Sequence, residues 1–101
     1  MTLDEIIKQC LQDGEDWFPH TFRDVPFLTL AMCGEAGECA NLVKKFVRGS
    51  RTAEGLQDAL EEELTDVFIY LMSLVGELEF DIVAKYEEKR QKNVERFGRT
   101  A

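Results

Sequence analysis

Two long stretches of the chain carry apolar residues at the spacing of a helix, and this spacing is the strongest constraint on the fold. Between residues 25 and 47, and again between residues 57 and 76, apolar side chains recur every three or four positions. At about 100° per residue they fall on one broad stripe of a helix surface. No segment shows the strict alternation of a strand. The sequence therefore predicts an all-α protein.

Local signals divide the chain into four expected helices that form one bundle. Thr2 opens a capping box, and Asp24 is a candidate N-cap for the second helix. Gly14, Gly76 and Gly98 are expected to end the first, third and fourth helices. A length of 101 residues suits a single domain with a small core. The expected helices cover about residues 2–13, 25–47, 57–76 and 79–97.

The net charge limits the classes of partner that the chain is expected to bind, and the cysteine content indicates its cellular compartment. With a formal net charge of −8, the chain is not expected to bind nucleic acid or an anionic membrane, because such affinity comes mainly from Lys and Arg. No apolar run approaches the roughly 18 residues of a membrane-spanning helix, and the acidic start is unlike a signal peptide. Cys10, Cys33 and Cys39 have no metal-binding spacing, so we expect a reducing cytoplasm, with Cys33 and Cys39 in the core.

Four carboxylates have a spacing that is typical of a metal site between two helices. Glu35 and Glu38 are three residues apart, as are Glu63 and Asp66, and such pairs lie on one side of a helix. Two facing pairs would offer the oxygen ligands that Mg²⁺ or Mn²⁺ prefers. Glu35 falls near the middle of an apolar stripe, where an unpaired charge is costly. The alternative is that these are ordinary acids on solvated faces, among the 20 acidic residues of the chain.

The last helix carries a cationic strip that would complement such a site. Its members project within roughly 100° of one another, and they are Lys85, Lys89, Lys92, Asn93 and Arg96. Cations beside a metal site are what a polyphosphate substrate requires. Tyr70, one turn after Asp66, lies on the same face as that carboxylate. The alternative is that the strip only complements the helix dipole.

Aromatic residues gather in the segment between the first two helices. Trp17, Phe18, His20 and Phe22 either stack on a nucleobase or cover the end of a small core or a dimer interface. We expect Trp17 to contact a base and Phe22 to have a structural role.

Gly34 and Gly37 lie inside the second expected helix, although each costs about 1 kcal/mol relative to Ala there. Because they have no side chains, the helix backbone beside the glutamates is accessible, and we call this stretch the thin wall. It allows either another helix or a ligand to approach closely.

The paired carboxylates resemble the signature of a known family. Glu35-Ala-Gly-Glu38, then 24 residues, then Glu63-Leu-Thr-Asp66 is similar to the E-x-x-E … E-x-x-D pattern of the all-α nucleoside triphosphate pyrophosphohydrolases. These include MazG-like proteins, dimeric dUTPases and dCTP pyrophosphatases. Residues 28–46 and 61–74 look like the two motif helices, and residues 89–97 resemble the C-terminal segment of that family. The resemblance covers about residues 17–98.

The resemblance implies hydrolysis of a (d)NTP to the (d)NMP and pyrophosphate, in nucleotide-pool housekeeping. It implies that Glu35, Glu38, Glu63 and Asp66 hold Mg²⁺, or Mn²⁺ in its place, and carry the catalysis. The implied substrate-binding residues are Trp17, Tyr70, Lys89, Asn93 and Arg96. It further implies a four-helix MazG-like bundle that assembles into a homodimer or a homotetramer built from dimers. Base specificity is expected from the loop at residues 14–25 and the connection at residues 48–56.

Two other functions fit the same residues. One is a noncatalytic helical module that keeps the acidic motif but binds a nucleotide or a protein, and the other is a structural cation-binding bundle.

Other catalytic chemistries lack the residues or motifs that they require. His20 is the only histidine, so a Ser-His-Asp triad is not supported, and neither a P-loop nor a Glu-x-x-His pair is present.

Overall fold

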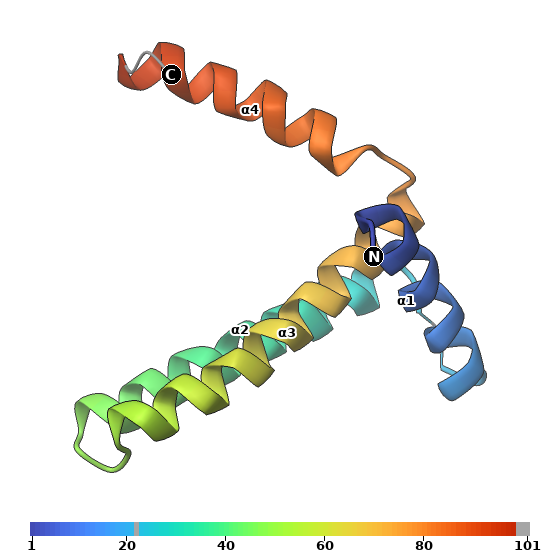
Figure 1. Cartoon of the computed structure of the whole chain (residues 1–101). Coiled ribbons are helices and arrows are strands. Elements are labelled where there is room, and N and C mark those ends of the chain that lie inside the picture. Colours follow the sequence, from blue (N-terminus) through green and yellow to red (C-terminus); the bar gives the residue numbers. More distant parts are fainter. Residues whose placement is uncertain (22, 99–101) are drawn as a thin grey trace.

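The computed structural model describes residues 1–21 and 23–98, and in these residues it contains four helices and no strand. The helices are α1 (Leu3–Trp17), α2 (Val25–Val47), α3 (Ala53–Leu78) and α4 (Ile82–Phe97) (Figure 1). The predicted all-α class is therefore confirmed for this part of the chain. Phe22, for which the sequence predicts a structural role, lies outside the described residues.

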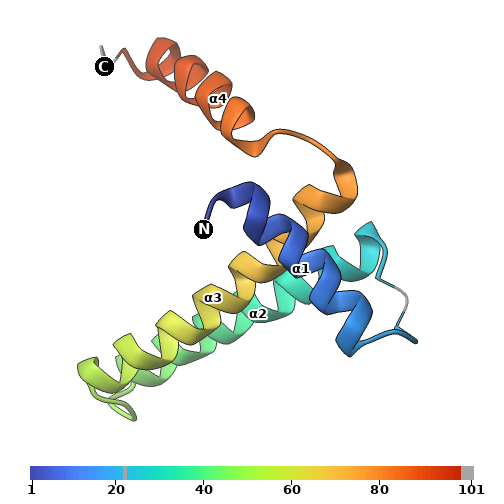
Figure 2. The same ribbon diagram turned by 45° about the vertical axis from the view of Figure 1, so that its right-hand side comes forward.

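The helices are arranged as a long hairpin with one helix packed on it and one standing apart. α2 and α3 run side by side along their length, and α1 packs across the C-terminal part of α3 (Figures 1 and 2). α4 leads away from the hairpin in both views. The radius of gyration is 16.7 Å, compared with about 13 Å for a compact domain of this length. One chain thus does not close the expected four-helix bundle by itself.

Three of the predicted helix boundaries are confirmed by their capping contacts. The Glu5 N–H donates to Thr2 Oγ1 at 3.1 Å, and the Thr2 N–H donates to Glu5 Oε1 at 3.1 Å, which completes the capping box. Asp24 caps α2 by accepting from the Phe27 N–H at 3.0 Å. Gly98, with φ of 69°, ends α4 in the left-handed conformation.

The two interior glycines expected to end helices do not do so. α1 continues through Gly14 to Trp17, and α3 continues through Gly76 to Leu78. Both glycines instead permit close contact between segments. A Cβ atom at Gly76 would lie 2.7 Å from Cδ1 of Leu11 on α1, and one at Gly14 would occupy the place of the Arg23 guanidinium. The prediction that a helix ends at each of these glycines is therefore wrong. The glycines are there because another segment packs against them.

The predicted end of α2 at Val47 is confirmed, whereas the starts of α3 and α4 differ from expectation because short polar residues form caps. Thr52 accepts from the Gly55 N–H at 3.0 Å, so α3 begins at Ala53 rather than at 57. Asp81 accepts from the Ala84 N–H at 3.0 Å and starts α4 at Ile82. The connection between the long helices is correspondingly shorter than expected.

The chain buries few apolar side chains and leaves many exposed. The buried apolar residues are Cys10, Leu28, Met72, Leu74 and Val75. By contrast, Leu30 on α2 is 74% exposed and Tyr86 on α4 is 64% exposed. Such uncovered apolar surface is unusual for a chain that works alone.

The cysteines are only partly placed as predicted. Cys33 is exposed, so its predicted core position is wrong in the single chain, whereas Cys39 is half-buried. No helix within residues 1–21 and 23–98 is both long enough and apolar enough to cross a membrane.

Candidate functional site

Three of the four predicted carboxylates meet between the two long helices. α2 contributes Glu35, and α3 contributes Glu63 and Asp66. One carboxylate oxygen from each residue lies within 4.8 Å of the others. Glu63 and Asp66 come together because three residues are nearly one helical turn, and the pairing of α2 with α3 adds Glu35. We call these three residues the carboxylate cluster.

Glu38, the fourth predicted ligand, does not join the carboxylate cluster. It lies nearly one turn beyond Glu35 on α2 and is exposed. Asp66 also borders a shallow hollow of about 540 Å³ whose other lining residues include Glu61 and Glu62. The region around the cluster therefore carries a strong negative charge.

The crowding of acids changes the titration of one member of the cluster. A hydrogen bond with Glu35, partial burial, and the charges of Glu35 and Asp66 together raise the pKa of Glu63. Carboxylates that crowd together without a metal are expected to raise the pKa of at least one of them.

In chelator, the free energy of unfolding is expected to fall as the pH rises above the ordinary carboxyl value of 4.5. The folded protein binds the Glu63 proton more tightly than the unfolded chain, so stability is highest while Glu63 is protonated and is lost as it ionises. Glu63→Gln should flatten this dependence and raise the Tm at neutral pH. Thermal melts from mildly acidic to neutral pH measure this dependence of stability on pH, and Glu62→Gln serves as the control. Equal slopes for the Glu63→Gln variant and the wild type would contradict this origin.

The donor set of the cluster fits a small hard cation. In an octahedral Mg²⁺ site with metal–oxygen distances near 2.1 Å, opposite ligands are about 4.2 Å apart. The cluster oxygens lie within 4.8 Å of one another, so small side-chain movements would bring them to ligand spacing. A divalent cation would also offset the repulsion by Glu35 and Asp66, which adds to the effect of the hydrogen bond with Glu35 in raising the pKa of Glu63.

The predicted phosphate-binding residues of α4 are not close to the cluster within one chain. Lys89, Asn93 and Arg96 lie on the helix that leads away from α2 and α3 (Figure 2). Arg96 sits over the Phe97 ring, 5.2 Å from its centroid. The neighbouring cations are partly neutralised locally, because Glu88 pairs with Lys92 at 3.3 Å and with Lys85 at 3.6 Å.

Trp17, which is predicted to contact a base, meets Tyr70, a predicted substrate-binding residue, in a cavity at the end of the hairpin where α1 packs. Trp17 and Tyr70 both line this cavity of about 330 Å³, which we call the aromatic cavity. Phe18, Phe27 and Ile69 supply more of its apolar wall. The segment at residues 48–56, from which base specificity is also expected, lies at the opposite end of the hairpin (Figure 1).

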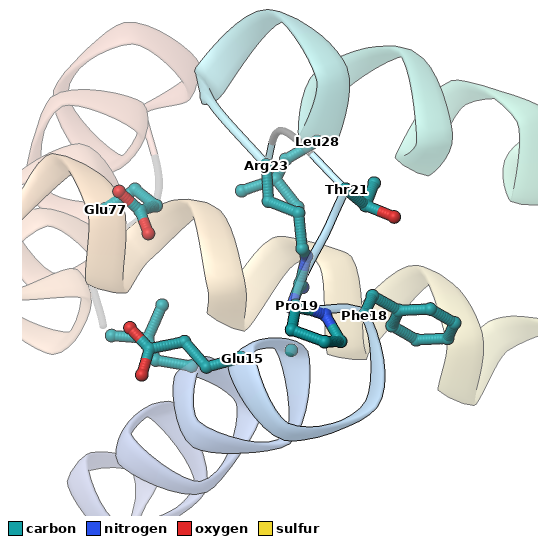
Figure 3. Close-up of a pocket in the computed structure, with 9 residues that line it drawn as sticks. Glu15, Phe18, Pro19, Thr21, Arg23, Leu28 and Glu77 are labelled. Atoms are coloured by element: carbon teal, nitrogen blue, oxygen red, sulfur yellow. The ribbon is translucent and has the colours of Figure 1, made fainter.

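A second cavity, of about 520 Å³, adjoins the aromatic cavity and shares the Arg23 side chain with it. Figure 3 shows Arg23 extending toward Pro19, with Glu15 and Glu77 on one side of the space and Phe18 on another. Sequence reasoning did not single out Arg23 or Asp13, which also lines the aromatic cavity. The available signal was that Asp13 lies four residues before Trp17, on the same face of α1.

The thin wall predicted at Gly34 and Gly37 is open in the chain. A Cβ atom at either position would meet no other atom within 4 Å in the described residues. Within residues 1–21 and 23–98, no other helix therefore covers this face of α2, which leaves the surface free for a ligand or a second copy.

Comparisons with known proteins provide little guidance on function. No protein-family model matches the chain, and no solved structure matches it. The Gene 37 protein of Mycobacterium phage L5 is 43% identical to it over an alignment of 62 residues, and the match covers 58% of this chain and 54% of that protein. The chain thus spans about half the length of this curated relative. The name of the relative states no activity, so function has to be argued from the site.

Proposed function

We propose that this chain is a MazG-like nucleoside triphosphate pyrophosphohydrolase that acts in nucleotide-pool housekeeping. The observation that carries the proposal is the convergence of Glu35, Glu63 and Asp66 from two helices, with carboxylate oxygens within 4.8 Å. The resemblance of both acidic motifs to that family gives the reaction: a (d)NTP is hydrolysed to the (d)NMP and pyrophosphate.

The carboxylate cluster would hold Mg²⁺, with Mn²⁺ as a substitute. Carboxylate oxygens are the ligands that these hard cations select, and no nitrogen or sulfur ligand belongs to the cluster. When bound, the cation offsets the negative charge that develops on the phosphate oxygens.

The hydrolysis requires a group that takes a proton from the attacking water. The water oxygen bonds to the α-phosphorus, the bond from that phosphorus to the bridging oxygen breaks, and pyrophosphate leaves. We assign the proton to Glu38, because this exposed carboxylate lies next to the cluster without belonging to it.

Substrate phosphates need cations that the single chain does not bring to the cluster. We propose that α4 of a second copy lies along α2 and α3 and supplies Lys89, Asn93 and Arg96, within a homodimer or a homotetramer of two dimers. Two observations support this arrangement. The exposed apolar residues of α4, including Val83 and Tyr86, need a partner, as do those of the hairpin. The cations of α4 also complement the acids between α2 and α3.

The proposed reaction is tested by an assay of pyrophosphate release. The purified chain is incubated with a panel of NTPs and dNTPs, in Mg²⁺, in Mn²⁺ and in chelator. We expect pyrophosphate and the monophosphate in equal amounts, with either metal and not with chelator. Release of inorganic phosphate in place of pyrophosphate, or metal-independent release, would contradict the assignment.

A noncatalytic nucleotide-binding module is the second candidate, favoured by the separation of α4 from α2 and α3, the two helices that carry the cluster, in one chain (Figures 1 and 2). Such a module would be stabilised by nucleotide together with metal, but would release no pyrophosphate. A structural cation-binding bundle would gain stability from the metal alone, because only a ligand that binds the native state raises the Tm.

A further inference from the structure

We propose that the aromatic cavity binds a nucleobase that carries an exocyclic amino group, and that Asp13 accepts a hydrogen bond from that amino group. The inference rests on the proposed function and extends it, because it names the class of base. It concerns two residues, Asp13 and Arg23, that the acidic motifs do not include.

The aromatic cavity has the size and walls of a base site. Its volume of about 330 Å³ is near the lower end of the range of about 300–1,000 Å³ for ligand pockets, which suits one ring system. Trp17, Phe18 and Phe27 offer ring faces, and bases stack on such rings whatever their identity. Trp17 is 68% exposed, so it is available to a ligand.

The aromatic cavity lies at a suitable distance from the carboxylate cluster. Tyr70 lines the cavity and follows Asp66 by four residues, which is about 6 Å along α3. Phe27 lines it from α2 and precedes Glu35 by eight residues, which is about 12 Å. A nucleotide with its base in the cavity would therefore extend its phosphates toward the carboxylates.

Asp13 is positioned to accept a hydrogen bond from a ligand. Its Oδ1 accepts from Gln9 Nε2 at 2.7 Å, which fixes the carboxylate on α1. No hydrogen bond to Oδ2 is formed within residues 1–21 and 23–98, so this oxygen can accept from a ligand in the cavity that Asp13 lines. An Asp or Glu side chain typically accepts from the exocyclic amino group of cytosine.

Arg23 adds a donor to the same cavity. Its guanidinium lies against Gly14, where a side chain would displace it. It forms no ion pair with Asp13 or with any other acid in the described part of the chain. Both residues lie near the buried Cys10, whose thiol pKa is raised by burial and by Asp13 and lowered by Arg23. An acceptor and a donor therefore line one cavity.

This pairing of groups separates the bases into two classes. Cytosine, adenine and guanine each present an amino group close to a ring or carbonyl acceptor, which matches Asp13 and Arg23. Uracil and thymine present a carbonyl oxygen in place of the amino group, and a carboxylate facing that oxygen is repelled. The aromatic cavity should therefore favour amino-bearing bases.

The fluorescence of Trp17 tests this preference without catalysis. Trp17 is the only tryptophan of the chain and lines the aromatic cavity. The full chain is titrated in chelator with the monophosphates of all five bases, with excitation at the red edge of tryptophan absorption. We expect saturable quenching, with dissociation constants for the amino-bearing bases about tenfold lower than those for uracil and thymine. Equal constants for all bases, or no quenching, would overturn the proposal.

A matched pair of variants assigns the preference to one carboxylate. Asp13→Asn replaces an oxygen by a donor and should abolish the preference for amino-bearing bases. Asp16→Asn is the control, because Asp16 accepts from Gln12 Nε2 at 2.9 Å in the same kind of pair but does not line the aromatic cavity. Circular dichroism checks that both variants keep their helices. A preference that survives Asp13→Asn, or that Asp16→Asn removes equally, would overturn the role of Asp13.

The same titration separates this inference from the proposed reaction. If the chain releases pyrophosphate but Trp17 shows no base preference, the reaction stands and the base assignment is wrong. If amino-bearing monophosphates bind but no triphosphate is hydrolysed, the base assignment stands and the hydrolase proposal is wrong.

Discussion

Replacing Asp66 by Asn is expected to lower metal-dependent pyrophosphate release by at least about a hundredfold. Loss of a residue that merely supports a metal ligand costs about 10–100-fold, so loss of a ligand should cost at least as much. Asp66 contributes one of the three clustered oxygens, and the amide that replaces it carries no charge. The measurement is the initial rate of pyrophosphate release at saturating Mg²⁺, together with Mn²⁺ binding.

Two further variants make this result specific to the site. Glu38→Gln should lower the rate by a similar factor but leave Mn²⁺ binding nearly unchanged, because Glu38 lies outside the carboxylate cluster. Glu62→Gln is the control for loss of an acid from α3 and should keep the wild-type rate. A rate near that of the wild type for the Asp66→Asn variant, in folded protein, would rule out the proposed metal site.

The starts of α1 and α2 could be predicted from the sequence, whereas those of α3 and α4 were misplaced by a few residues. Thr2 and Asp24 bind backbone N–H groups three residues away in the chain, so their effect depends only on nearby residues. The glycines mislead, because a glycine that ends a helix and one that admits a neighbour look alike in sequence. Gly14 and Gly76 are of the second kind, because each admits a side chain from outside its own helix: Arg23 at Gly14, and Ile7 and Leu11 at Gly76.

The candidate site could also be predicted only in part. The i, i+3 spacing brings Glu63 and Asp66 together, and the apolar stripe around Glu35 predicts its half-buried place. The separation of α4 from its own hairpin was not predictable, because the place of a helix depends on contacts with residues beyond its own sequence. Asp13 and Arg23 were missed because single charged residues near a helix end are common.

Mixing two inactive variants is expected to restore activity if α4 of one copy completes the site of the other. One variant, Asp66→Asn, lacks the carboxylate cluster, and the second, Lys89→Ala with Arg96→Ala, lacks the cations of α4. Each alone should release little pyrophosphate. In a mixed dimer, the intact acids of the second variant meet the intact α4 of the first, so one site works. Coexpression in equal amounts should then restore roughly a quarter of the wild-type sites.

If α4 instead folds back on the hairpin of its own chain, mixing restores no activity. Every site is then built from one chain and lacks either the acids or the cations. Coexpression of Asp66→Asn with Glu63→Gln is the matched control, since both changes disable the same cluster and no pairing restores it. Differently tagged chains show whether mixed assemblies form. If they form and remain inactive, the cations act within one chain, and α4 must move about the segment at residues 79–81 to reach the carboxylates. If activity returns, the separation of α4 from its own hairpin (Figure 1) reflects a helix that belongs to the site of its partner.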